Sequence, residues 1–306
     1  RSSVLRAQSK LLEGKRALVV GGTSGLGEAM AMQFAEASAS VTIVGRNVQR
    51  GREIVEQLRT KGPGAMTFMP CDATLVRNAK QLSTQLVEDL GDLPLDALVM
   101  AQGIATLQGF TPSPQEGLDQ KLTLHAYSRA AFPLHLLSAL AKSDDPRVLS
   151  IFSAGVHSDY LGYDKDVELC KEGSYTTTNS VNSTGCYNDI IFDSLSRENK
   201  DIIFAHSAPG FVATNWGTEM PMIVRMLLPI AKLFARSQDD AAKYMFDGLY
   251  NIEGKGGFHM LDQYGKPTPK VVPSHEIARP IVWDHIKKIV ETEHSLDFDL
   301  PEDKKS

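Results

Sequence analysis

Three glycines near the start of the chain have a spacing that suits the binding of a phosphate group. The segment GGTSGLGEAMA places Gly21, Gly25 and Gly27 in a G-x-x-x-G-x-G pattern directly after an apolar run, and a helix-like segment follows. Glycine lets the main chain turn tightly and approach a pyrophosphate closely, and the first N–H groups of a helix point toward such an anion. The pattern predicts a dinucleotide-binding turn, with an ordinary strand-to-helix turn as the alternative.

An arginine after the next apolar run indicates which dinucleotide would bind. The segment VTIVGRN puts Gly45 and Arg46 where an NAD-binding protein places a carboxylate for the ribose 2′-hydroxyl. A guanidinium pairs instead with a 2′-phosphate. We therefore predict NADP(H) as the cofactor, and the alternative is a surface arginine at the start of a helix.

The elements that must position these residues are short apolar runs separated by segments with a helical period. This alternation predicts an α/β fold, a Rossmann-type doubly wound parallel sheet of about seven strands with helices on both faces. Right-handed crossovers then place the carboxyl ends of the strands along one ligand-binding edge. The strand candidates are RALVVG from Arg16, SVTIVG from Ser40, AMTFMPCD from Ala65, LDALVMAQG from Leu95, RVLSIFSAG from Arg147 and IIFAHSAPG from Ile202.

Six motifs at these strand ends resemble, in their order, those of the short-chain dehydrogenase/reductases. They are the glycine turn, CDAT, AQG, SIFSAG, Tyr187 and PGFVATN. The resemblance covers about residues 12 to 265, and within the family the chain is most similar to fungal members associated with secondary metabolism. The resemblance implies contacts to NADP(H) from Gly21, Thr23, Ser24, Gly25, Leu26, Gly27, Arg46, Asn47, Asp72, Ala73, Ala101, Gln102, Gly103, Pro209, Gly210, Val212 and Thr214.

The resemblance also implies a reaction centre. In the family, a serine binds the carbonyl oxygen of the substrate, and a tyrosine passes a proton to or from that oxygen. Ser153 in SIFSAG and Tyr187 in GCYNDIIFDSL match these two residues. The alternatives are a serine that caps a strand-end turn and a core tyrosine that is bonded elsewhere.

Two departures from the family pattern affect this centre. Ile191 stands where the family has a lysine one helical turn after the tyrosine, and His125 stands where relatives have an asparagine. Losing the lysine handicaps alcohol oxidation more than ketone reduction, because reduction needs only a neutral phenol as acid. We predict His125 as a third catalytic candidate, with a histidine satisfied by helix packing as the alternative. Asp189 and Asp193 are expected on a solvated edge of the same helix.

Bulk properties exclude some classes of function. The net charge of -5 and the 23% charged residues give no attraction for nucleic acid or an anionic membrane. Cys71, Cys170 and Cys186 form no C-x-x-C pair, which indicates a reduced, cytoplasmic protein without a metal site. The first residues hold no apolar run of signal-peptide length, and no transmembrane segment is expected.

We expect a single domain over residues 1–306. It would carry an inserted loop at 157–184, an apolar substrate-covering flap at 216–236 and a C-terminal extension at 266–306. The resemblance implies a homo-oligomer, a dimer or a tetramer, formed through paired helices that include the one with Tyr187.

Three functions remain open from the sequence. The leading hypothesis is an NADP(H)-dependent oxidoreductase that reduces a carbonyl of a small apolar metabolite, polyketide-like or terpenoid-like, in biosynthesis. The second is a non-redox isomerase, dehydratase or cyclase on the same scaffold, which the altered proton relay favours. The third is an NADP-binding protein without turnover.

Overall fold

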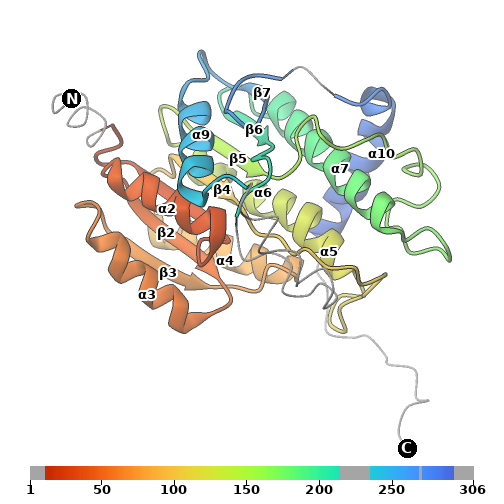
Figure 1. The fold of residues 1–306 in the computed structure, drawn as a ribbon, viewed down its shortest axis with the longest axis horizontal. Coiled ribbons are helices and arrows are strands. Elements are labelled where there is room, and N and C mark those ends of the chain that lie inside the picture. Colours follow the sequence, from red (N-terminus) through yellow and green to blue (C-terminus); the bar gives the residue numbers. More distant parts are fainter. Residues whose placement is uncertain (1–10, 214–234, 269–270, 293–306) are drawn as a thin grey trace, which may run out of the picture.

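The sheet has seven strands, all parallel, in the order β3-β2-β1-β4-β5-β6-β7 (Figure 1). The computed structural model describes residues 11–213, 235–268 and 271–292. All six strand candidates are confirmed, and a seventh strand follows them. The strands are β1 (Arg16–Val20), β2 (Ser40–Gly45), β3 (Met66–Pro70), β4 (Ala97–Met100), β5 (Arg147–Ile151), β6 (Ile203–Ser207) and β7 (Gly257–Leu261).

Helices cover both faces of the sheet, so the predicted Rossmann-type α/β fold is confirmed. On one face lie α2 (Gly25–Glu36), α3 (Val48–Arg59) and α9 (Gln238–Tyr250). On the other lie α4 (Val76–Leu90), α6 (Ser128–Leu140) and α7 (Thr177–Glu198), with α10 (His275–Glu291) packed on α7. A short α5 (Gln120–Leu122) and a π-helix η1 (Thr123–Tyr127) lead into α6. Each face has its own apolar core, which is why β5 and β6 are buried along their whole length.

The strand order reverses between β1 and β4. Chains that leave these two strands cross to opposite faces, and ligands of open α/β sheets bind in the crevice that results. Here the turn after β1 packs tightly on the segment after β4, since a Cβ at Gly21 would lie 2.6 Å from the main-chain nitrogen of Gln102. The predicted nucleotide-binding edge therefore has the expected topology.

The helix that carries Tyr187 begins earlier than expected. We expected a loop over 157–184, but α7 starts at Thr177, where the Thr176 hydroxyl accepts a hydrogen bond from the N–H of Asn179 at 3.0 Å. Its first turns are rich in serine, threonine and asparagine, and these residues mask the helical period. The inserted segment is therefore residues 157–176. The Asp166 carboxylate shapes this segment by accepting the N–H groups of Cys170 and Lys171.

The C-terminal extension places α10 against α7, as Figure 1 shows. Trp283 donates its indole N–H to Glu198 at 2.9 Å, and the hydroxyl of Tyr127 lies 3.1 Å from Nε2 of His285. We expected α7 to pair between subunits, but α10 of the same chain covers one face of α7. The flap at 216–236 falls almost entirely outside the described residues. No helix in the described part of the chain is long and apolar enough to cross a membrane.

Candidate active site

The glycine turn after β1 leaves a helix terminus without a protein cap. Gly21 has a φ of +80°, and a Cβ at Gly27 would lie 2.2 Å from the carbonyl oxygen of Gly21, so both positions require glycine. The N-cap residue of α2, Ser24, forms no side-chain hydrogen bond to the first turn. The turn thus offers main-chain N–H groups and no bulk, which fits the pyrophosphate of a dinucleotide.

A cavity of about 660 Å³ lies where β2 and β3 end, beside α4. Arg46, after β2, and Asp72, after β3, line it. Within the described residues, Arg46 forms no hydrogen bond or ion pair, so its guanidinium is available for an anion. The Asp72 carboxylate is fixed by Thr74, whose N–H and hydroxyl donate to it at 3.1 and 2.8 Å. An arginine and an oriented carboxylate suit the adenosine 2′-phosphate and the adenine amine of NADP(H), respectively.

Some of the other residues expected to contact the cofactor make contacts within the protein. The side chain of Asn47 caps α3 by accepting the N–H of Arg50 at 2.9 Å. Thr23 packs on Gly45, where a Cβ would lie 2.4 Å from its hydroxyl oxygen. Ala101, Gln102 and Gly103 follow β4, and Pro209, Gly210 and Val212 follow β6, so both groups lie at the predicted edge. Thr214 lies outside the described residues.

Ser153 lies beside two histidines and an aspartate from three different segments. Its N–H donates to Nε2 of His206 at 3.0 Å, and its hydroxyl lies 3.4 Å from Nδ1 of His157. Asp189 joins the two imidazoles, because its oxygens lie 2.6 Å from Nδ1 of His206 and 3.2 Å from Nε2 of His157. The side chains of all three partners are fully buried. We call His157, Asp189 and His206 the histidine–aspartate cluster.

The hydrogen bonds of the cluster set its charges. Nε2 of His206 accepts the N–H of Ser153, so this imidazole is neutral, and burial lowers its pKa further. His157 faces acceptors on both sides, with its Nδ1 donating to the Ser153 carbonyl at 2.9 Å. Burial lowers the pKa of His157, but the adjacent Asp189 carboxylate, with Cys186, raises it to about 10. His157 is therefore an imidazolium, ion-paired with an Asp189 carboxylate whose own pKa is lowered by the two histidines against the effect of burial.

This arrangement differs from that of a serine hydrolase. A nucleophilic serine needs a neutral imidazole nitrogen that can accept its proton. Nδ1 of His157 already carries a proton and donates it to the Ser153 carbonyl. The geometry therefore makes His157 an acid toward Ser153 and not a base.

The prediction that Tyr187 and Ser153 share one reaction centre is wrong in this structure. The face of α7 toward Ser153 carries Gly185 and Asp189, since a Cβ at Gly185 would lie 2.4 Å from the His157 ring. Tyr187 is two residues from each of them and so points to nearly the opposite side of the helix. Its hydroxyl donates to the carbonyl of Val167 at 2.9 Å, and burial raises its pKa well above the ordinary value. Tyr187 is a core tyrosine that anchors the inserted segment.

The departure from the family pattern is consequently larger than the sequence suggested. Ile191 shares the side of Tyr187 and is buried in the same apolar core. The α7 face toward Ser153 carries, one turn apart, Val181, Gly185 and Asp189. None of these three residues is a tyrosine or a lysine. The last of them, Asp189, contacts His157 and His206 instead.

His125 has a packing role in this structure. Its Nε2 accepts the N–H of Ile104 at 3.0 Å, and burial, with the charge of Arg129, lowers its pKa to about 3. The imidazole is therefore neutral, and the nitrogen that would take up a proton is already engaged. The main-chain carbonyl of His125 accepts the Asn188 amide at 2.7 Å, which ties η1 to α7. These contacts match the packing alternative and give His125 no contact with Ser153.

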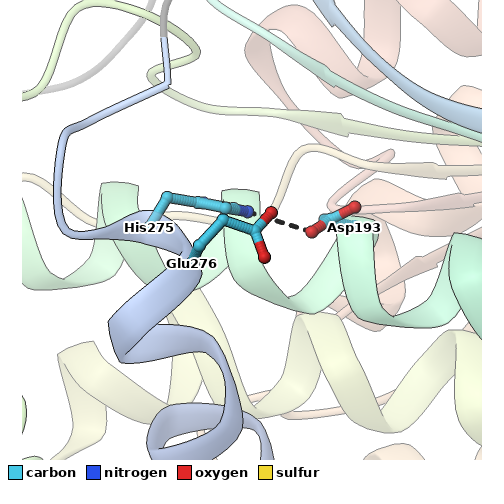
Figure 2. A group of neighbouring side chains, drawn as sticks. All are labelled: Asp193, His275 and Glu276. Atoms are coloured by element: carbon cyan, nitrogen blue, oxygen red, sulfur yellow. Dashed lines mark hydrogen bonds and ion pairs between the residues drawn. The ribbon is translucent and has the colours of Figure 1, made fainter.

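Asp189 and Asp193 are not on a solvated edge as expected. Asp189 is fully buried in the histidine–aspartate cluster, and Asp193 is held by cations where α10 meets α7. Figure 2 shows Asp193 with His275 and Glu276, a grouping with ligand atoms close enough for a metal ion. Arg197 pairs with both carboxylates, however, at 2.8 and 2.5 Å. The grouping is an ion-pair network that docks α10, and it lowers the pKa of Asp193 to about 2 although burial acts the other way.

Comparison with known proteins agrees with the fold and the motifs. The family model for short chain dehydrogenases matches residues 15–160. An oxidoreductase of Emericella nidulans is 32% identical over 202 residues, which cover 65% of this chain and 59% of that protein. An NmrA-like family domain-containing oxidoreductase of an Aspergillus species is 26% identical over 203 residues, 65% of this chain and 60% of that protein. The chain thus spans about three fifths of the length of both fungal relatives.

Solved structures show the same architecture. A short chain dehydrogenase of Shigella flexneri, complexed with NADP, superposes with a TM-score of 0.62 at 18% identity and covers 83% of this chain and 99% of its own. An alcohol dehydrogenase of Thermococcus sibiricus, complexed with 5-hydroxy-NADP, gives 0.60 at 19% identity, with 83% and 99% covered. Residues 15–160, which the family model matches, therefore belong to the short-chain dehydrogenase family, and the seven-stranded sheet has the fold of the solved short-chain dehydrogenases.

Proposed function

We propose that the chain is an NADP(H)-dependent oxidoreductase that reduces a carbonyl group of a small apolar metabolite. The observation that carries this proposal is the cavity at the ends of β2 and β3, which Arg46, unpaired within the described residues, and the oriented Asp72 both line. When bound, NADPH supplies the hydride for such a reduction. The fungal relatives named as oxidoreductases and the NADP complexes of similar fold support the proposal.

Ser153 provides the substrate end of the proposed site. It follows β5 at the sheet edge that also carries the glycine turn, and its hydroxyl is a donor for a carbonyl oxygen. Exposed apolar side chains occur in the segments that leave the same edge. They are Leu107 and Phe110 after β4, Val156 after β5, Val181 on α7 and Phe211 after β6. Apolar side chains exposed in these segments favour an apolar substrate, in line with a role in the biosynthesis of such metabolites.

Replacing Arg46 with alanine tests the cofactor assignment. A charge-assisted hydrogen bond to a phosphate contributes roughly 1.5–3 kcal/mol, so the affinity for NADPH should fall about 10- to 150-fold. The affinity for NADH should change little, because NADH lacks the 2′-phosphate. Fluorescence titration of both nucleotides measures this, and Arg59→Ala at the far end of α3 is the control for a lost surface charge. Equal losses for NADPH and NADH would refute the role of Arg46.

A non-redox reaction is the second candidate. The His157 imidazolium next to Ser153 polarises a carbonyl without any hydride, as an isomerase or cyclase requires. Under this candidate, product forms at the same rate with and without NADPH. Turnover that needs stoichiometric NADPH excludes it.

A further inference from the structure

We propose that His157 takes the place of the missing tyrosine as the proton source of the reaction, acting through the hydroxyl of Ser153, and that Asp189 and His206 position it. This inference rests on the proposed function and assigns the acid of that site. It is carried by the closed chain of contacts that joins Ser153, His157, Asp189 and His206.

The position of His157 is fixed on both sides of its ring. Nδ1 lies 2.9 Å from the carbonyl oxygen and 3.4 Å from the hydroxyl oxygen of Ser153, so one N–H is directed at this residue. Nε2 lies 3.2 Å from Asp189, an ion pair between fully buried groups. Gly185 leaves the space for the ring, because a Cβ there would lie 2.4 Å from it. Gly185 therefore makes room for the His157 imidazole, and Asp189, one turn later, forms the ion pair with it.

His206 completes the geometry from β6. It stacks on His157 with ring centroids 6.3 Å apart, donates to Asp189 and accepts the N–H of Ser153. The main chain of Ser153 and the carboxylate are therefore held by one side chain. Without Asp189 the His157 cation would be buried alone, and its proton would be lost to water.

Within the described residues, the two other candidate proton donors, Tyr187 and His125, make contacts away from Ser153. Tyr187 donates to Val167 on the far side of α7, and His125 is neutral with Nε2 engaged. His157 has a pKa of about 10, which is close to that of a free phenol. An imidazolium of this strength replaces a neutral tyrosine as the acid for reduction at neutral pH.

The proposed step conserves protons and electrons. Bound NADPH would supply a hydride to the carbonyl carbon, and the carbonyl oxygen would gain the hydroxyl proton of Ser153. The Nδ1–H of His157 would give up its hydrogen bond to the Ser153 carbonyl, and its proton would move to the Ser153 hydroxyl oxygen, 3.4 Å away. His157 becomes neutral and regains a proton from water once the alcohol has left.

Three variants of the full chain test this inference. His157→Gln removes the acid, Asp189→Asn removes the charge that holds the proton, and Tyr187→Phe is the matched control on the other face of α7. Each is assayed with NADPH and a panel of cyclic and aryl ketones, and NADPH binding is titrated by fluorescence as a check on folding. Loss of a general acid lowers kcat by roughly 100- to 10,000-fold, so His157→Gln should lose at least about 100-fold with KM and NADPH affinity little changed. Tyr187→Phe should keep kcat within about threefold of the wild type.

The protonation of His157 is measured separately in the NADPH complex by ¹⁵N NMR of labelled histidine. The groups that act on His157 are Asp189 and Cys186 of α7 and His206 of β6, and Arg129 of α6 acts on His206. The wild type should keep both nitrogens of His157 protonated at pH 8. In Asp189→Asn, the pKa of His157 should fall below about 6.5. The pH above which kcat declines should fall with it.

The outcomes separate this inference from the proposed function. A wild-type chain that does not bind NADPH would overturn the proposed function. NADPH-dependent turnover that survives in His157→Gln but is lost in Tyr187→Phe would overturn the inference and leave the function standing. A neutral His157 at pH 7 in the wild type would overturn it as well.

Discussion

Replacing Arg129 with methionine is expected to lower the free energy of unfolding by about 3–5 kcal/mol. Arg129 is fully buried, and its guanidinium donates to the carbonyl oxygens of Met100 and Ile151 and to the Ser150 hydroxyl at 3.3, 3.0 and 2.6 Å. It also donates to the carbonyl of Gln102. These acceptors belong to the ends of β4 and β5, the two strands that lead to the candidate site.

The cost arises from the acceptors that the variant leaves without a donor. Each unsatisfied buried acceptor costs about 1–3 kcal/mol, and the relief from burying a cation offsets part of the sum. That burial is substantial, since it lowers the pKa of Arg129 to about 9. Methionine matches the length of the side chain, so lost packing contributes little.

Urea unfolding at pH 7 measures this effect, with Arg59→Met as the control. Arg59 is exposed on α3 and pairs with Glu56 at 2.5 Å, so its loss should cost less than about 1 kcal/mol. Arg129→Met should also reduce turnover, because the strand end that carries Ser153 loses its tie to β4. An Arg129→Met variant as stable as the wild type would show that other donors satisfy these carbonyls.

The wild type is expected to lose about 3 kcal/mol more of its unfolding free energy between pH 7 and pH 10 than His157→Gln does. The pKa of His157 is about 10 in the folded chain and about 6.5 in the unfolded one. A raised pKa means that this stabilisation is fully present below pH 6.5 and is lost as the pH rises toward 10. Asp189, whose pKa is lowered, loses its contribution only as the pH falls below about 4, outside this window.

Chemical unfolding of both proteins at closely spaced pH values checks this difference. Comparing wild type and variant removes the groups common to both, such as Cys71, whose thiol pKa burial raises to about 12. Parallel stability curves across this range would mean that His157 is neutral in the folded chain, and the assignment of the cluster would fail.

The sheet was predictable because its strands are apolar runs that parallel sheets require, and the tight turn after β1 because glycines at strand ends have few other uses. The proposed reaction centre was not predictable. Residues Ser183–Ser196 of α7 are all buried, between the sheet and α10, so no single apolar stripe marks the side that faces the site. The tyrosine that looked catalytic lies on the other side, and Asp189 looked solvated because its partners, His157 and His206, come from distant segments.

We propose that hydride moves from NADPH to a carbonyl carbon held at Ser153. The most direct test is a single-turnover reaction of the full chain with NADPH deuterated at the transferred position and the ketone panel, followed by mass spectrometry of the product. We expect one deuterium on the new carbinol carbon for each NADP⁺ formed, and no product from Ser153→Ala. Product without deuterium, formed equally well in the absence of NADPH, would contradict the claim.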